Sequence, residues 1–319
     1  MLKNFAKAKS LRFMPAAVAN GIGQVMFQPC ILTGLLFLVG IFIGSIECGM
    51  PQIGAGALTG AVSATLAGTL ISPDLIQHKA GIWGFNGTLI GCAFPTFFAA
   101  NGFMWGALIF FSILSPVLQK GLNSAMSACN INSLTIPFVL LTWIAILAAQ
   151  SFGNLKLIAT ISDSTSINDS LNYSLQDIAI YCLKGISQVF LINSWITGII
   201  FIIALAICSR RAAIWAIVGS GTALTTSILL GASYDAIANG LYGFSPVLTA
   251  IALGCTFSRP GVHNTIITLI AIVFTVILQG AMNVMLLPAG IPALTAPFCI
   301  VTWVFMLSSH ADDDVSHSE

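Results

Sequence analysis

The chain has 319 residues, of which 57% are hydrophobic and 7% are charged, and its mean hydropathy is +0.97. So few charged residues cannot cover a soluble surface, and the composition therefore predicts a polytopic membrane protein. The net charge is only +1, and no basic patch carries interleaved aromatic residues, which excludes nucleic acid as a partner.

Apolar stretches long enough to cross a membrane follow one another along the chain, since about 20 such residues span the hydrocarbon core. We expect ten spans, near residues 24–44, 54–72, 82–99, 103–119 and 134–150 in the first half, and near 188–208, 212–231, 241–257, 262–279 and 293–309 in the second. Residues 121–133 and 280–292 are too short and too polar to cross. We interpret each of these two stretches as a re-entrant half-helix sheltered by protein.

The polar stretch 151–184 separates a first repeat, residues 1–150, from a second repeat, residues 185–310, and an acidic tail follows at 311–319. Basic residues accumulate on the cytoplasmic side of membrane proteins. With a cytoplasmic N-terminus, nine of the 11 lie inside and only Lys156 and Lys184 lie outside. We therefore expect a cell-membrane protein, surrounded by lipid, with both termini in the cytoplasm. Five crossings per repeat would then insert the second repeat upside down relative to the first.

A duplicated element supports this two-repeat organisation. Residues 134–143 read LTIPFVLLTW and residues 294–303 read LTAPFCIVTW, with six identities in ten positions at an offset of 160. Similarly, GIGQV at 21–25 is matched by GISQV at 185–189. The inverted-repeat arrangement places a solute site near the middle of the membrane, where Thr135 and Thr295 would meet.

The chemistry of that site is predicted to be uncharged. The acidic and basic residues and all four histidines fall in loops or at the ends of the expected spans, whereas ion pathways and proton relays usually need such residues inside them. The spans also lack a catalytic or metal-ligand set, so we expect neither an enzyme nor a cofactor. The polar groups that remain are hydroxyls, amides and backbone carbonyls. They favour a small neutral solute with several hydrogen-bond donors, because each donor that loses water needs an acceptor.

At this point the residues resemble a known family. The stretch IPALTAPF at 291–298 is similar to the L-P-x-x-T-x-P-F signature of the urea transporter family, with Ile291 in place of the first leucine. The first copy, INSLTIPF at 131–138, departs further because Asn132 stands where the signature has proline. The Gly-Phe pairs at 84–85 and 243–244 also look like elements of that family. The resemblance covers nearly the whole chain.

The resemblance implies a passive, channel-type pathway for urea or close amide analogues in each subunit of a homotrimer. Urea is flat, with four N–H donors and one carbonyl acceptor, so a selectivity filter of apolar slots and a ladder of oxygens would match its shape. The family pattern assigns this filter to the aromatic faces Phe85 and Phe244, the narrow central walls Leu89 and Leu248, the flanks Phe27 and Val189, the central hydroxyls of Thr135 and Thr295, and Gln24 and Gln188 at the mouths.

Each assignment has a structural alternative. A phenylalanine or leucine in a span usually faces lipid or packs in the bundle, and a threonine before a proline can bond a backbone carbonyl at a helix break. The two glutamines could bridge helices. An ion-coupled secondary transporter of another small neutral solute is the alternative function, to which the absence of charged residues from the spans is the main objection.

Overall fold

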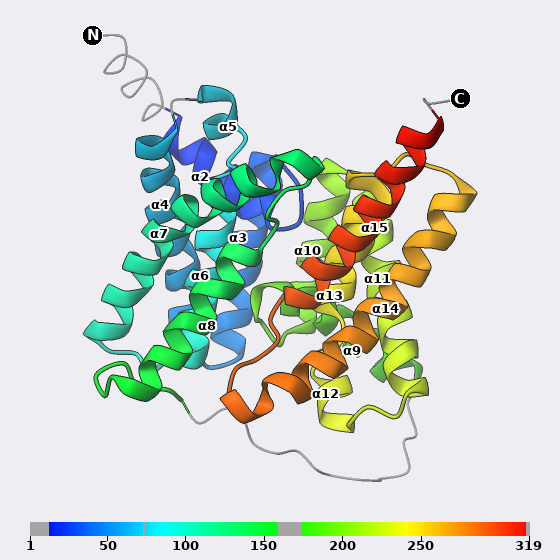
Figure 1. Cartoon of the computed structure of the whole chain (residues 1–319). Helices are drawn as coiled ribbons and strands as arrows, with labels where there is room; N and C mark the ends of the chain where they lie inside the picture. The colour runs from blue at the N-terminus through cyan, green and yellow to red at the C-terminus, as the bar shows by residue number, and fades with distance from the viewer. Residues whose placement is uncertain (1–12, 73, 159–173, 317–319) are drawn as a thin grey trace.

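The computed structural model describes residues 13–72, 74–158 and 174–316, and these residues form a helical bundle with one isolated β-bridge, between Phe98 and Leu157 (Figure 1). The first half contains α2 (Met14–Gln24), α3 (Ile31–Glu47), α4 (Gln52–Ile71), α5 (Leu75–Lys79), α6 (Phe85–Phe97), α7 (Gly102–Met126), the 3₁₀ helix η1 (Ser127–Cys129) and α8 (Ile136–Ser151). The second half contains α9 (Leu175–Ser187), η2 (Gln188–Phe190), α10 (Trp195–Cys208), α11 (Arg210–Leu229), α12 (Tyr234–Ala238), α13 (Phe244–Ile251), the π-helix η3 (Ala252–Thr256), α14 (Val262–Leu286), η4 (Leu287–Ala289) and α15 (Ala296–Ser316).

The order of helices in the first half is repeated in the second. The helices α7 and α14 begin at Gly102 and Val262, and α8 and α15 begin at Ile136 and Ala296, so each pair is 160 residues apart. This spacing equals the offset between the two Thr-x-Pro-Phe elements. The duplication seen in ten residues of sequence therefore extends to the secondary structure of both halves.

Length and apolar composition identify several helices that can cross a membrane. Four qualify among the described residues, namely α4, α7 with η1, α11, and α14 with η4. The pair formed by α9–η2 and α10 is bent by 74° and would add a fifth if it is a single broken span. Shorter apolar helices include α3, α8 and the first part of α15. The chain is thus an all-helical, multi-pass membrane protein.

The expected re-entrant half-helices at 121–133 and 280–292 are wrong. Helix α7 runs without a break from Gly102 to Met126 and α14 runs from Val262 to Leu286, so each helix continues into the stretch that was expected to turn back. A helix of 25 residues is about 38 Å long at 1.5 Å per residue, which exceeds a hydrocarbon core of about 30 Å. Polar residues near its end can therefore lie outside that core without breaking the helix.

The breaks occur instead at the start of each half. The expected span 24–44 is divided, because α2 ends at Gln24, Phe27 adopts a left-handed backbone with φ of 62°, and α3 begins only at Ile31. The second half has the same feature, with Leu191 at φ 58° between η2 and α10. The short helix α9 also occupies the last part of the stretch expected to be a connector, whose residues 159–173 lie outside the described structure.

The broken helices pack backbone against backbone. A Cβ atom placed on Gly34 of α3 would lie 1.7 Å from the carbonyl oxygen of Ala19 in α2, and one placed on Gly198 of α10 would lie 2.2 Å from that of Leu183 in α9. Both distances are far shorter than any non-bonded contact between carbon and oxygen. Glycine at these two positions therefore allows the short helix of each half to lie directly on the next one.

Reciprocal hydrogen bonds join the two halves. The indole Nε1–H of Trp143 donates to the carbonyl of Pro292 at 2.8 Å, and that of Trp303 donates to the carbonyl of Asn132 at 2.8 Å. The hydroxyls of Thr33 and Thr197 likewise donate to carbonyls of α10 and α3, at 2.8 and 2.9 Å respectively. Each bond from the first half to the second is thus matched by an equivalent bond in the reverse direction.

We expect Trp143→Phe and Trp303→Phe to destabilise the protein by similar amounts. Each substitution removes one indole donor of the same bond length, and a typical hydrogen bond contributes about 1 kcal/mol to stability. Thermal unfolding of the purified protein in detergent would measure both variants side by side. A large shift in the unfolding temperature for one variant and none for the other would contradict the equivalence of the two contacts.

Candidate solute site

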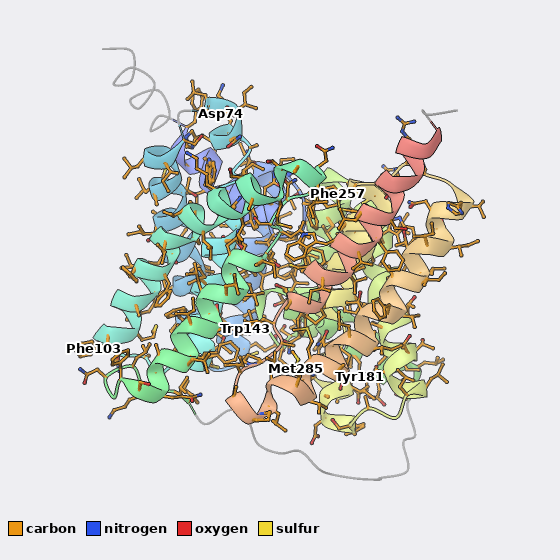
Figure 2. All side chains as sticks on the ribbon, viewed as in Figure 1. Asp74, Phe103, Trp143, Tyr181, Phe257 and Met285 are labelled. Atoms are coloured by element: carbon orange, nitrogen blue, oxygen red, sulfur yellow. The ribbon has the colours of Figure 1, made fainter. Side chains whose placement is uncertain are left out.

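Two large cavities lie at opposite ends of the bundle. The first-repeat cavity, of about 500 Å³, is bounded by residues that include Gln24, Phe27, Phe85 and Thr135, and the second-repeat cavity, of about 400 Å³, by residues that include Gln188, Val189, Phe244 and Thr295. The first is lined by Gln24 of α2 and Gln77 of α5, and the second by Gln188, which follows α9, and Leu241, which follows α12. Figure 1 shows α2 and α5 at one end of the bundle and α9 and α12 at the other. Figure 2 places Phe257, which lines the first cavity, well away from Tyr181 of α9.

The lining of both cavities is uncharged and mostly apolar, with several polar side chains. Among the described residues, those that bound the two cavities include no Asp, Glu, Lys, Arg or His. They include glutamine, asparagine and threonine side chains beside phenylalanine and leucine. A lining of this kind offers hydrogen bonds to a neutral molecule but no countercharge to a desolvated ion, whose burial is costly.

Two threonines meet between the cavities. The hydroxyl oxygens of Thr135 and Thr295 are 2.6 Å apart, both residues are 3% exposed, and Thr135 also contacts the Cys299 sulfur at 3.2 Å. Thr135 lines the first cavity and Thr295 lines the second. The hydroxyl pair therefore lies between the two cavities.

Local backbone geometry places these threonines. Each one directly follows a leucine with φ of 50°, Leu134 or Leu294, and Thr135 is the N-cap of α8. A left-handed backbone is uncommon for leucine and costs free energy, so it persists only where the surrounding structure imposes it. Pro137 follows within the first turn of α8, where its missing N–H is not needed. The same sequence of conformations in both repeats brings the two hydroxyls face to face.

The two predicted glutamines occupy equivalent positions. The amide Nε2 of Gln24 donates to the carbonyl of Ala80 at 3.0 Å, and that of Gln188 donates to the carbonyl of Asn239 at 2.9 Å. Each bond ties the end of a short helix to the segment that precedes α6 or α13. Each glutamine keeps its side-chain carbonyl oxygen and the second N–H of its amide as groups that can bind a solute.

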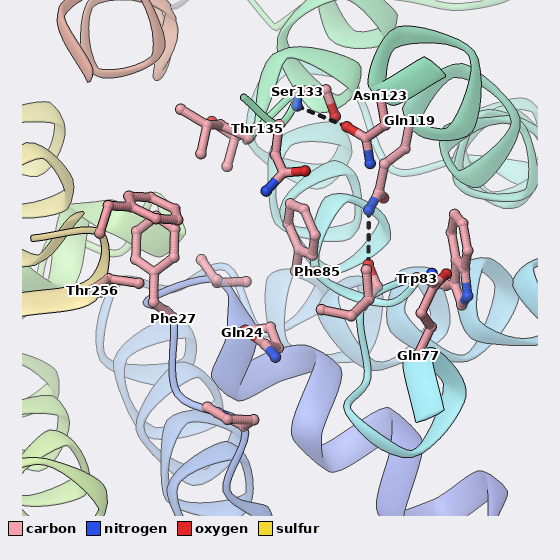
Figure 3. Close-up of a pocket in the computed structure, with 16 residues that line it drawn as sticks. Gln24, Phe27, Gln77, Trp83, Phe85, Gln119, Asn123, Ser133, Thr135 and Thr256 are labelled. Atoms are coloured by element: carbon pink, nitrogen blue, oxygen red, sulfur yellow. Dashed lines mark hydrogen bonds between the residues drawn. The ribbon is translucent and has the colours of Figure 1, made fainter. Parts of the chain in front are cut away.

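Aromatic rings form part of the cavity walls. In the first cavity, the rings of Phe27 and Phe85 lie on opposite sides of the space above Gln24 in the view of Figure 3. Phe27 packs edge to face against Phe257 of the second repeat, with ring centroids 5.5 Å apart. Phe244 lines the second cavity together with Val189. Each wall combines residues from both repeats.

Leu89 and Leu248 lie elsewhere. They are one helical turn beyond Phe85 and Phe244, both are fully buried in the main hydrophobic core, and neither lines either cavity. The structure thus brings eight of the ten predicted residues to the cavity walls and leaves these two behind them. The role of the two leucines as narrow walls of a pathway stays a prediction.

Several cavity residues were missed in the sequence. The amides of Gln119 and Asn123 line the first cavity, and those of Gln279 and Asn283 line the second. A signal for them exists, because both pairs recur at the offset of 160 that separates Thr135 from Thr295. The cross-repeat residues Phe97 and Phe257 carry the same signal, because they too are 160 residues apart.

A buried amide network supports the first cavity. Gln119 donates through Nε2 to the carbonyl of Ile82 at 3.0 Å and accepts through Oε1 from Nδ2 of Asn86 at 3.1 Å (Figure 3 shows the first of these bonds). Asn86 in turn accepts from the backbone N–H of Phe138 at 3.2 Å. This network fixes α6, α7 and the start of α8 against one another, and it uses both polar atoms of the Gln119 side chain.

A duplicated bundle of apolar helices, with uncharged cavities at its two ends and a hydroxyl pair between them, is the architecture of a membrane transport protein. The sequence model of a family described as "Urea transporter" matches residues 16–310, and the chain belongs to that family, which is one of transporters and not of enzymes. The chain is 28% identical over 320 residues to urea transporter 1 of Ovis aries, a match that covers 96% of this chain and 81% of the relative. The match to urea transporter 1 of Capra hircus has the same identity and coverage, and that of Rattus norvegicus is 27% identical over 317 residues.

Proposed function

We propose that the protein is a passive channel through which urea crosses the membrane by way of the second-repeat cavity, the threonine pair and the first-repeat cavity. The observation that carries this proposal is the Thr135–Thr295 hydroxyl pair between two uncharged cavities. Hydroxyl and amide oxygens can accept the four N–H donors of urea, and the absence of a charged group from the lining gives an ion no compensation for its lost water. Membership of the urea transporter family supports the choice of solute.

The threonine pair would act as a shared contact that the solute replaces. In the closed arrangement each hydroxyl satisfies the other at 2.6 Å. A urea molecule that reaches the pair can donate an N–H to the accepting hydroxyl and accept, through its carbonyl oxygen, from the donating hydroxyl, so the pair can open without leaving a buried polar group unpaired. Phe85 and Phe244 would hold the flat solute, while Leu89 and Leu248 would come to line the path once the pair separates.

The wider arrangement belongs to the same proposal. The two repeats would be inverted in the membrane and each protomer of a homotrimer would hold its own pathway. Three basic residues lie on the side of the first cavity, namely Lys79 of α5, Lys120 of α7 and Arg211 of α11. Lys120 donates to the carbonyl of Ile71. Arg211 donates to the carbonyl of Gly254, near the lining residue Thr256. By the positive-inside tendency this side would face the cytoplasm.

A flux measurement tests the proposal. We expect proteoliposomes that contain the purified protein to take up urea much faster than glycerol when no ion gradient is present. Stopped-flow light scattering would follow vesicle volume, with protein-free liposomes as the control. Urea flux no faster than in those liposomes, or uptake that disappears when a proton or sodium gradient is collapsed, would overturn a passive urea channel.

A further inference from the structure

One buried acceptor beside the second-repeat cavity has no partner. Gln279 of α14 lines this cavity and is 2% exposed, and its carbonyl Oε1 accepts no hydrogen bond among the described residues. The amide Nε2 donates to the backbone carbonyl of Leu241. Because a carbonyl accepts only from a donor, this contact fixes which end of the amide is the nitrogen. The unpartnered atom is therefore an oxygen.

The first repeat shows what normally fills this position. Its equivalent glutamine, Gln119, makes the same bond to the carbonyl of Ile82, but its Oε1 accepts from Asn86 at 3.1 Å. The residue equivalent to Asn86 is Ser245, whose shorter side chain donates instead to the carbonyl of Leu294 at 3.3 Å. Replacement of one amide donor by a serine thus leaves one acceptor unsatisfied in the second repeat only.

We infer that Gln279 Oε1 forms a solute-binding subsite of the second-repeat cavity that accepts an N–H from a neutral amide, and that the first-repeat cavity has no such subsite. An unpaired carbonyl away from water is costly, and a donor that reaches it gains more than it would at an already bonded group. Gln188, Asn283 and Thr295 lie on the same lining and can bind the other groups of the same solute. This inference rests on the proposed function. It means that the two ends of the pathway differ in the hydrogen-bond acceptors that they offer to a solute.

The sharpest test restores the missing donor. In Ser245→Asn, the new amide would occupy the position that Asn86 holds in the first repeat and would bond Gln279 Oε1. We expect the urea concentration that gives half-maximal uptake to rise about three-fold or more, as loss of one hydrogen bond predicts. Ser245→Ala is the matched control, because it removes the bond to Leu294 and leaves Oε1 free. Its half-maximal concentration should equal that of the unmodified protein.

Initial rates of radiolabelled urea uptake into intact cells that express the full chain would give these concentrations, because every copy then has the same orientation. Gln279→Met is a second variant that removes the acceptor in a side chain of similar length, and it should raise the half-maximal concentration as Ser245→Asn does. Size-exclusion chromatography would show whether either variant folds.

The outcomes separate the two proposals. Saturable urea uptake by the unmodified protein, with unchanged half-maximal concentrations in both Ser245→Asn and Gln279→Met, would overturn the subsite and assign Gln279 Oε1 to a resident water. Absence of any urea uptake by the unmodified protein would instead overturn the proposed function.

Discussion

Replacement of Thr295 by valine should lower urea flux by about five- to 140-fold. Valine has almost the same shape as threonine but cannot accept a hydrogen bond, and a buried donor left without its acceptor costs about 1 to 3 kcal/mol, with about 1.4 kcal/mol for each factor of ten. The loss falls on the solute where it passes between the two cavities, the place that Thr135 and Thr295 occupy. Stopped-flow measurements on proteoliposomes would give the flux per protein.

The same helix offers a matched control. Thr302 lies two turns further along α15, is fully buried, lines neither cavity, and its hydroxyl has no hydrogen-bond partner among the described residues. Thr302→Val should therefore fold and conduct urea as the unmodified protein does. Thr135→Val should behave like Thr295→Val. Unchanged flux in both of these variants would remove the hydroxyl pair from the mechanism.

Gly34→Ala should prevent the protein from folding. The added Cβ would lie 1.7 Å from the carbonyl oxygen of Ala19, and a backbone atom cannot move aside as the tip of a side chain can. Relief of this overlap requires α2 and α3 to separate, which would displace Gln24 and Phe27 from the first cavity. The yield of monodisperse protein in size-exclusion chromatography would report the effect.

A glycine elsewhere in the bundle shows whether the effect is specific. Gly106 lies within α7, and a Cβ placed there has no atom within 4 Å. Gly106→Ala should fold at least as well as the unmodified protein, because alanine is the better helix former. Normal yield and an unchanged unfolding temperature for Gly34→Ala would show that the two helices do not pack as described.

The sequence was sufficient to predict that two particular threonines meet. The offset of 160 residues between the two Thr-x-Pro-Phe elements identified Thr135 and Thr295 as a pair, and the structure joins their hydroxyls. The offset works because a duplicated sequence element adopts the same turn twice, here with Leu134 and Leu294 at the same φ. Equivalent turns in the two halves then place equivalent residues against each other, as they do for these two threonines.

The position of the helix breaks was not predictable from composition. Residues 121–133 contain glycine, asparagine and serine, yet α7 continues into them, because such residues are tolerated near a helix end. Residues 24–44 are mostly apolar, yet the helix is interrupted between Gln24 and Ile31. This interval contains Pro29, which cannot donate a backbone hydrogen bond. Polarity was therefore a poor guide to the first break, and the equivalent break between η2 and α10 has no proline to mark it.

The remaining differences concern which side of a helix faces the cavity. Leu89 and Leu248 follow Phe85 and Phe244 at helical spacing, yet both are fully buried in the main hydrophobic core and line neither cavity. Sequence spacing gives the face shared by two residues, but not the depth to which each is buried. That depth depends on contacts between repeats, such as the one between Phe27 and Phe257.

The hydroxyl pair has a further property that follows from the number of its hydrogen atoms. Only one hydrogen can lie on the 2.6 Å line between Thr135 and Thr295, so at any instant one threonine donates and the other accepts. The other hydrogen must point elsewhere, and Cys299 gives Thr135 a sulfur neighbour where the second repeat's equivalent contact would involve Val139. Two repeats of identical sequence would therefore still differ at this contact, because one threonine donates and the other accepts. In the proposed channel, this difference between the two threonines would change how long a solute stays bound at each of them. Without an energy source it would not change the solute concentrations at which net movement across the membrane stops.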